Sequence, residues 1–205
     1  MKLTVCIPTF NEELNIKKCL KKIKWANKII IFDSKSSDKT INIAKTFKNT
    51  KIINAKKKLD YVSKLNYLLR KTKNMWVLFI DADYVLSDKL VKKIRKLDNN
   101  YIKKNNINGF KIPIYNKIFG KIIKENIYPK KILLFKNSDC YFKRIGHAEK
   151  LLIKKKNIFT LKEFILHENL NDIENFKLWK LNQIKYSKKD AKRIIKTKFS
   201  NLRIQ

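Results

Sequence analysis

Short hydrophobic runs alternate with more polar stretches along the first hundred residues of the chain. Four such runs cover residues 3–7, 28–32, 51–55 and 76–80. They are shorter than an ordinary helix and rich in β-branched or aromatic residues, so each predicts a buried strand. Strands that are buried on both faces are typical of parallel α/β sheets.

The stretches between these runs carry apolar residues at helical spacing. Helices are predicted at four places: from Glu12 with Asn11 as N-cap, over 40–47, over 61–70, and after an N-cap at Ser87. This alternation is the pattern of a doubly wound, Rossmann-like half. Right-handed crossovers then place the loops at Pro8, Asp33 and Asp81 along one rim of the sheet.

The second half of the chain is less regular. Short strands are predicted over 109–114, 131–135 and 150–153, and a loop rich in Lys and Asn over 115–130. From Asn171 onward the pattern predicts a basic helix. Its apolar stripe consists of Ile173, Phe176, Trp179, Ile184, Ala191 and Ile195. The stripe could pack on the sheet or lie on an anionic membrane interface, and the two are compatible.

The composition is strongly basic, with a formal net charge of +33. Lys, Asn and Ile make up about half of the residues, and all three have A/T-rich codons, so base bias explains part of the excess. Arg, which evolved nucleic-acid surfaces favour, is scarce. The remaining charge suits an anionic membrane or phosphates. A hydrophobic content of 44% excludes a disordered chain.

The cysteines and the distribution of apolar residues bear on the compartment. Cys6, Cys19 and Cys140 have no metal-like spacing and suit reduced thiols. The first predicted strand begins almost at Met1, and no apolar run approaches the length of a membrane span. The sequence therefore predicts a cytoplasmic protein that is soluble or peripheral on the inner face of the cell membrane, with no secretory leader.

Two carboxylates follow the fourth hydrophobic run. Asp81 and Asp83 lie two positions apart, so in extended chain both side chains point to the same side. Open α/β sheets bind ligands just beyond the carboxyl ends of their strands. Two acids at that place suit a hard divalent cation that substrate phosphates also hold. The alternative is that they cap a turn before the next helix.

Four segments occur in an order and at a spacing that resemble a known family. They are Val-Cys-Ile-Pro-Thr-Phe-Asn-Glu-Glu at 5–13, Ile-Ile-Phe-Asp-Ser-Lys-Ser-Ser-Asp-Lys-Thr at 30–40, Lys-Leu-Asn at 64–66, and Trp-Val-Leu-Phe-Ile-Asp-Ala-Asp at 76–83. Together they resemble the family-2 glycosyltransferases of the GT-A fold, most of all small bacterial enzymes that extend lipopolysaccharide cores and surface glycans. The resemblance covers about the first 90 residues.

The resemblance implies a mixed, mainly parallel sheet flanked by helices, with a C-terminal helical segment. It also implies three parts: a nucleotide-sugar half at 1–100, an acceptor-side half at 101–170 and a basic helix at 171–205. The donor would be a nucleotide sugar, with UDP favoured, and the cofactor Mn²⁺ or Mg²⁺. The implied cation ligands are Asp83, Asp81 and His167. The implied nucleotide contacts are Pro8, Thr9, Glu12, Asp33, Ser34, Asn66 and Asp81.

Some of these roles have plain structural alternatives. Asp33 would accept a hydrogen bond from the base, or it would only cap the following loop. His167 would complete the cation shell, because imidazole is a plausible manganese ligand, or it would be structural. The general base must come from the second half. Glu149 is the first candidate and His147 the second, and the alternative is an exposed turn.

The chain departs from the family pattern at several positions. Ser34 stands where many relatives have a second acid, and Tyr84 where they often have Glu. Lys35 and Lys39 replace glycines, and lysine tolerates positive φ poorly, so a different loop geometry is expected. These departures leave open a catalytically inactive, glycosyltransferase-like binding protein.

The hypothesis is a metal-dependent, inverting glycosyltransferase in cell-surface polysaccharide or lipopolysaccharide synthesis. It would act on a glycan or lipid-linked acceptor, with no nucleic-acid partner. Inversion rests on the resemblance alone. The main alternative is a basic nucleic-acid-binding protein, which would show a steep dependence of affinity on salt.

Overall fold

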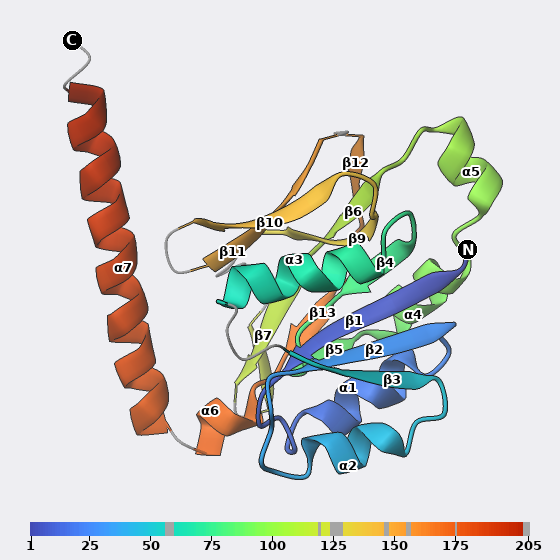
Figure 1. The fold of residues 1–205 in the computed structure, drawn as a ribbon, viewed down its shortest axis with the longest axis horizontal. Coiled ribbons are helices and arrows are strands. Elements are labelled where there is room, and N and C mark those ends of the chain that lie inside the picture. Colours follow the sequence, from blue (N-terminus) through green and yellow to red (C-terminus); the bar gives the residue numbers. More distant parts are fainter. Residues whose placement is uncertain are drawn as a thin grey trace.

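The fold is built around a mixed seven-stranded sheet, seen in a computed structural model of the chain (Figure 1). The structure describes residues 1–55, 60–118, 120–123, 129–145, 148–154, 157–174 and 176–202. In spatial order the strands are β12 (Ile158–Thr160), β6 (Gly109–Ile112), β9 (Lys131–Lys136), β4 (Trp76–Phe79), β1 (Leu3–Thr9), β2 (Lys28–Asp33) and β3 (Thr50–Asn54). β9 runs antiparallel to β4 and β6, whereas β4, β1, β2 and β3 are parallel. The predicted mainly parallel sheet is confirmed.

Helices cover both faces of this sheet. They are α1 (Ile16–Ile23), α2 (Thr40–Lys45), α3 (Tyr61–Lys71), α4 (Asp88–Arg95) and α5 (Asn99–Lys104). α3 packs on one face, and α1, α2 and α4 lie on the other (Figure 1). Alternate strand residues divide between the two layers: Val5 and Ile7 join the α1 side and Cys6 the α3 side. This period of two follows from the pleat of the strands, and it buries both faces.

The first helix begins later than predicted. α1 starts at Ile16 with Asn15 as its N-cap, not at Glu12 with Asn11 as the cap. Asn11 instead has a positive φ of 54°. Its side-chain oxygen accepts a hydrogen bond from the Ser37 amide at 2.9 Å. The asparagine therefore joins the loops after β1 and β2. By contrast, the Ser87 side chain accepts from the Leu90 amide, which confirms that cap.

The acceptor-side half contains more strand than the sequence predicted. A four-stranded sheet has the order β5 (Tyr84–Leu86), β13 (Ile165–His167), β7 (Ile114–Ile118) and β8 (Lys121–Ile123), and β10 (Cys140–Ile145) pairs with β11 (Ala148–Ile153). The prediction of a loop over 115–130 is therefore wrong for much of this range, because β7 and β8 pair there as antiparallel strands. Pro113 separates β6 from β7. Proline has no amide hydrogen to donate to a ladder, which explains the break.

The chain ends in two helices, α6 (Leu170–Glu174) and α7 (Phe176–Leu202), as the pattern from Asn171 predicted. α7 extends away from the sheets (Figure 1). Ile184 and Ile195 of the predicted stripe are exposed, so packing of these residues on the sheet is wrong. Among the described helices, none combines the length and apolar character needed to cross a bilayer.

Candidate active site

A cavity of about 550 Å³ lies where the loops after β1, β2 and β4 meet. Six residues singled out in the sequence line it: Pro8, Thr9, Glu12, Ser34, Asp81 and Asp83. The register of the parallel strands explains this convergence. Thr9 lies opposite Asp33, and Cys6 opposite Phe79, so all three strands end at one edge. The structure thus confirms the predicted rim of loops.

His167 reaches this rim from a distant part of the chain. Its Nε2 lies 3.1 Å from Asp83 Oδ2, and its Nδ1 lies 2.9 Å from the Asn116 side-chain oxygen. Burial opposes a charged imidazole, but the hydrogen bond to Asp83 and the charges of Asp83 and Asp81 outweigh it and raise the pKa of His167. Both ring nitrogens face acceptors, so the imidazolium form satisfies them, and a cation bound at Nε2 would take the place of the proton there. The site therefore holds a His–Asp pair.

Three carboxylates crowd the cavity. Burial, together with the charges of Asp83 and Asp81, raises the pKa of Glu12 to about 7, although Asn15 donates a hydrogen bond to it at 2.8 Å. Burial and the neighbouring Asp83 also raise the pKa of Asp81. These shifts arise because negative charges are close together in a partly water-excluded site. A bound cation would relieve this repulsion.

The donor set fits a divalent cation. Asp83 Oδ1 is buried and has no hydrogen-bond partner among the described residues. An unpaired buried carboxylate oxygen is costly, so a missing partner is expected there. Within the described part of the chain, no three His, Cys, Asp or Glu side chains form a complete cation shell. Mg²⁺ is commonly bound by one or two carboxylates plus substrate phosphates, which matches this partial set.

Asp33 forms the centre of a buried hydrogen-bond cluster instead of facing the cavity. It is 2% exposed. Its oxygens accept from the Thr9 hydroxyl at 2.9 Å, the Lys35 amide at 2.9 Å, and the Ser36 amide and hydroxyl at 2.8 and 2.6 Å. A carboxylate has about four acceptor positions, and all are filled. The arrangement favours the alternative that Asp33 caps the loop.

Lys35 adopts the conformation that glycine would favour. Its φ is +72°. The expectation of a different loop geometry is therefore wrong on this point, because the loop keeps a left-handed residue at position 35. A left-handed conformation costs an L-residue about 1–2 kcal/mol. The hydrogen bond from the Lys35 amide to Asp33 offsets part of this cost.

Asn66 holds the β10 strand against α3. Its side-chain amide donates to the Phe142 carbonyl at 3.0 Å, and its oxygen accepts from the Phe142 amide at 2.7 Å. This pair copies the hydrogen bonds of a neighbouring strand. Asn66 is not among the described residues that line the cavity. Its predicted nucleotide contact stays a prediction, and the structure shows a positioning role.

Four further residues line the cavity to which sequence reasoning gave no role: Ala82, between the two aspartates, and Phe10, Tyr61 and Lys64. Phe10 follows Thr9 and is 59% exposed, and Tyr61 and Lys64 lie on the first turn of α3. Burial and the charges of Asp81, Glu149, Asp83 and Glu12 raise the pKa of Tyr61. The sequence offered one indication of these two residues: Tyr61 and Lys64 are three positions apart in a predicted helix, so they lie on the same face. Lys64 brings a positive charge to an acidic cavity.

The first candidate base, Glu149, lies on β11, which pairs with β10. Glu149 is the second residue of β11, and its side chain is 21% exposed. It pairs with Arg144 across the hairpin, with 3.2 Å between Arg144 Nη2 and Glu149 Oε1. His147 lies outside the described residues.

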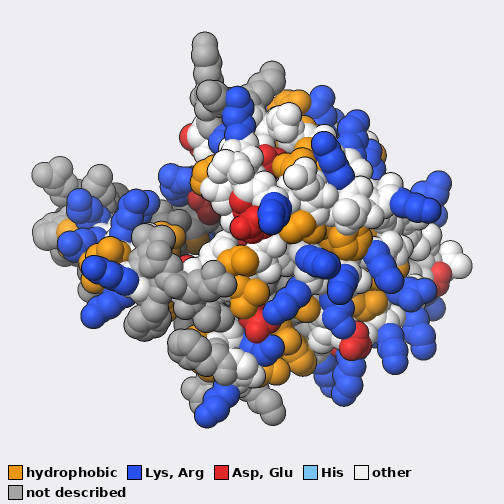
Figure 2. Space-filling model, turned by 90° about the horizontal axis from the view of Figure 1, so that it is seen from below, with side chains coloured by type: hydrophobic (Ala, Val, Ile, Leu, Met, Phe, Trp, Pro, Cys, Tyr) orange, Lys and Arg blue, Asp and Glu red, His pale blue; other side chains and the backbone are white. Residues whose placement is uncertain are grey.

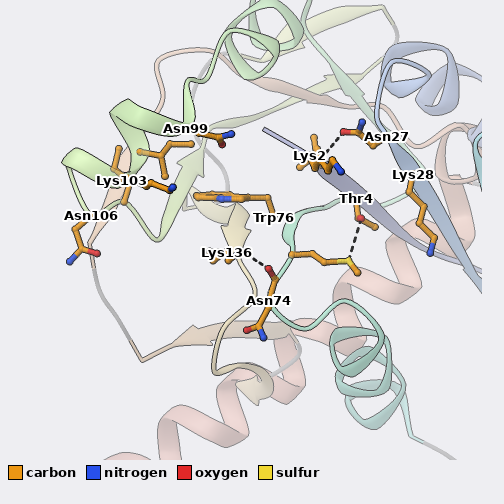
Figure 3. A pocket seen from close by; sticks show the side chains of 14 residues that line it. Lys2, Thr4, Asn27, Lys28, Asn74, Trp76, Asn99, Lys103, Asn106 and Lys136 are labelled. Carbon is orange, nitrogen blue, oxygen red and sulfur yellow. Dashed lines mark hydrogen bonds between the residues drawn. The ribbon is translucent and has the colours of Figure 1, made fainter.

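A larger cavity, of about 880 Å³, lies at the opposite end of the sheet (Figure 3). It surrounds the starts of β1 and β4, and Lys2, Lys28, Lys103 and Lys136 line it together with several asparagines. Among the described residues that line this cavity, none is an aspartate or a glutamate. A site for a divalent cation needs acidic oxygens, so the chemistry points to the smaller cavity at the carboxyl ends of the strands.

Comparisons with known proteins agree with this fold. The chain is 37% identical over 97 residues to the SPbeta prophage-derived glycosyltransferase SunS of Bacillus subtilis, covering 46% of this chain and 23% of that protein. It is 30% identical over 228 residues to an uncharacterized glycosyltransferase of Rickettsia bellii, covering 99% and 71%. The structure of S. aureus TarS 1–349 in complex with UDP-GlcNAc has a TM-score of 0.59 at 16% identity, covering 82% and 58%.

The chain spans less than two thirds of the Bacillus protein and of the TarS chain, so these likenesses concern the shared domain. Sequence similarity to a family described as Glycosyl transferase family 2 extends over residues 4–138. This range contains the first four parallel strands, the rim loops and the Asp81–Asp83 turn. The chain belongs to glycosyl transferase family 2.

Proposed function

We propose that the protein transfers a sugar from a nucleoside-diphosphate sugar to an acceptor hydroxyl in the rim cavity. The observation that carries this is the buried, unpaired oxygen of Asp83, set among Asp81, Glu12 and His167. Membership of family 2 supports the reaction class. The TarS structure was solved with UDP-GlcNAc, and a UDP-sugar is accordingly the donor that we favour.

Asp83, with Asp81 and His167, would hold Mn²⁺ or Mg²⁺. Such a cation, when bound, acts as a Lewis acid that neutralises a departing diphosphate. Asn116 contacts the other nitrogen of His167 and fixes the ring so that Nε2 faces Asp83. Contacts of this kind orient metal-binding histidines in proteins. Asn116 is thus a positioning residue in this proposal.

The chain's own residues would bind the rest of the donor. Pro8, Thr9 and Ser34 line the side of the cavity formed by the first two loops, where the nucleoside would lie. Phe10 offers an exposed ring for stacking on the base. Lys64 faces the same cavity, and its ammonium would contact diphosphate oxygens. These contacts would direct the anomeric carbon toward the β10–β11 hairpin.

Glu149 is our candidate for the general base. An inverting transfer needs one carboxylate that removes the proton of the acceptor hydroxyl as this oxygen attacks the anomeric carbon. Glu149 is partly buried, and Arg144 holds one of its oxygens. The other oxygen would accept the proton. The acceptor itself, a glycan or a lipid-linked saccharide of surface polysaccharide or lipopolysaccharide synthesis, rests on the sequence resemblance.

Binding of UDP and UDP-GlcNAc with and without Mn²⁺, measured by calorimetry, tests the donor site. We expect binding that needs the metal and is lost in Asp83→Ala. Asp88→Ala is a matched control, because Asp88 is an exposed carboxylate that pairs with Lys22. Full affinity without metal, and in Asp83→Ala, would contradict the proposal. Hydrolysis of the bound donor then separates an active enzyme from an inactive binding protein.

The basic surface does not favour the nucleic-acid alternative. Lys and Arg side chains are spread across the face shown in Figure 2 and are not gathered in one band. A nucleic-acid site normally concentrates its positive charge along a groove or stripe.

Two of the departures from the family pattern also fit the fold. Tyr84 is buried at the start of β5, where it lies opposite His167 of β13 in the strand pairing. Lys35 adopts the positive φ that a glycine would adopt at this place in the loop.

A further inference from the structure

Helix α7 carries apolar side chains that the described body of the protein leaves in solvent. Leu181, Ile184 and Ile195 are 57%, 44% and 53% exposed. Steps of three and eleven residues bring these side chains to one side of a helix with 3.6 residues per turn. With 27 residues the helix is about 40 Å long. The apolar stripe from Leu181 to Ile195 covers about 21 Å of this helix, and its exposure to water indicates a surface that another body covers.

Lysines adjoin the apolar stripe. Leu181 and Ile184 share a shallow hollow of about 400 Å³ with Lys185, Lys188, Lys189 and Lys192, all from α7. Asp190 is the only acidic residue in the sequence of this helix. Lysine stems can lie along an apolar surface while the ammonium groups reach water or anions. Figure 2 shows apolar and basic side chains next to one another on the part of the molecule that projects at the left, where α7 lies.

The charge of the protein decides between possible occupants. A second copy would bring another net charge of +33 against the first, so self-association through lysine-lined helices is disfavoured. A bilayer with anionic headgroups complements the lysines and accepts the apolar stripe at its acyl boundary. None of the described helices can span a membrane, so an α7 on a bilayer lies in its surface.

We propose that α7 binds an anionic lipid bilayer through one face, the α7 face, consisting of Leu181, Ile184, Ile195, Lys185, Lys188 and Lys189. α6 links this face to the donor loops. The Leu170 amide donates to the Asn15 side chain at 3.0 Å, and Asn171 donates to the Asn11 carbonyl at 3.1 Å. Docking therefore holds the rim cavity close to the lipid surface. That consequence rests on the proposed function, whereas docking itself does not.

Sedimentation of the full chain with vesicles tests the proposal. We expect binding to vesicles of phosphatidylcholine mixed with phosphatidylglycerol, weakened by salt, and none to phosphatidylcholine alone. The apolar variant Leu181→Gln/Ile184→Gln/Ile195→Gln keeps the charge and should lose binding. The charge variant Lys185→Gln/Lys188→Gln/Lys189→Gln should bind on the order of a hundredfold more weakly, at about fivefold per lysine.

A matched control separates docking from general attraction. Lys89→Gln/Lys92→Gln/Lys93→Gln removes the same charge from the exposed side of α4 and should bind vesicles nearly as the native protein does. Glutamine is a good helix former, and far-UV circular dichroism checks that α7 stays helical. Equal losses in the two lysine variants, or full binding by the apolar variant, would overturn the proposal.

Two further measurements exclude the other occupants. Light scattering would contradict the proposal if the native protein formed a dimer that the apolar variant breaks and the native protein did not bind vesicles. The partner of the α7 face would then be a second copy of the chain and not a bilayer. Preferential binding of RNA over anionic vesicles would also overturn the proposal. Asp83→Ala should sediment with vesicles as the native protein does. Failure of docking and failure of the donor site are thereby seen in different assays.

Discussion

The donor rim and α7 meet water in opposite ways. At the rim, polar groups are joined to one another: the buried Asp33 accepts four hydrogen bonds, and nearer the surface Asn11 and Glu13 accept from the Ser37 and Lys39 amides. On α7, apolar groups remain exposed and basic groups surround them. The difference teaches that folding itself holds the rim in shape, whereas α7 depends on a partner outside the described chain.

The same contrast separates two kinds of cost. A buried polar group that loses its partner pays its full desolvation penalty, so the rim tolerates little change. An exposed apolar residue contributes little to folding, and its replacement changes association instead. Variants at the rim should therefore alter the free energy of unfolding, and variants on α7 should leave it nearly unchanged.

The largest effect is expected for Asp33→Ala. The change strands the Thr9 and Ser36 hydroxyls and two loop amides in a buried place. We expect a loss of about 3–4 kcal/mol in the free energy of unfolding, measured with urea. Asp88→Ala, at an exposed ion pair, should cost far less. Equal small losses would show that Asp33 is not the centre of the rim.

Glu12→Gln should raise stability in a pH-dependent way. The pKa of Glu12 is raised from 4.5 to about 7, so the folded state binds this proton more tightly than the unfolded state does. That contribution is present below the unfolded pKa of 4.5 and is lost as the pH rises through about 7. Without metal, the variant should gain about 2 kcal/mol over the native protein near pH 8, after a discount for solvent screening.

The control for Glu12 is the same comparison at about pH 4, below the unfolded pKa of 4.5, where Glu12 is mostly protonated in both states and the two proteins should be almost equally stable. Thermal unfolding across the pH range measures both. A constant difference at every pH would mean that packing, and not charge, distinguishes glutamine from glutamate at this position.

Lys35→Gly should stabilise the rim slightly. Glycine adopts the φ of +72° without strain, which favours the folded state, but it also frees the unfolded chain. The net gain should be about 0.5–1 kcal/mol. Lys92→Gly, in the middle of α4, is the opposite control and should cost about 1 kcal/mol. Two losses of similar size in urea unfolding would contradict the left-handed conformation of Lys35.

The smallest effect on stability is expected on α7. The apolar variant of the α7 face should change the free energy of unfolding by less than about 0.5 kcal/mol, because its residues are already in solvent. The measurement is urea unfolding without lipid. A loss of about 2 kcal/mol or more would mean that the stripe packs on the protein in solution, as the sequence allowed.

The sequence by itself determined the donor half of the fold. Runs of apolar residues set the strands, and the parallel crossovers that follow from them bring the loops at Pro8, Asp33 and Asp81 to one rim. These features are local, since the period of an apolar pattern and a short loop length fix each element. The second half was less readable, because β8 and β13 are only three residues long and β13 pairs with β5 and β7, which lie far away in the sequence.

Only the tertiary structure decided which side chains meet. His167 contacts Asp83 across 84 positions, and Asn66 holds Phe142 across 76. Asp33 turned inward because Thr9 and Ser36 fill its oxygens, and α7 left the sheet because other elements already cover both of its faces. Such contacts depend on how the chain closes in three dimensions, and no pattern along the sequence specifies that closure.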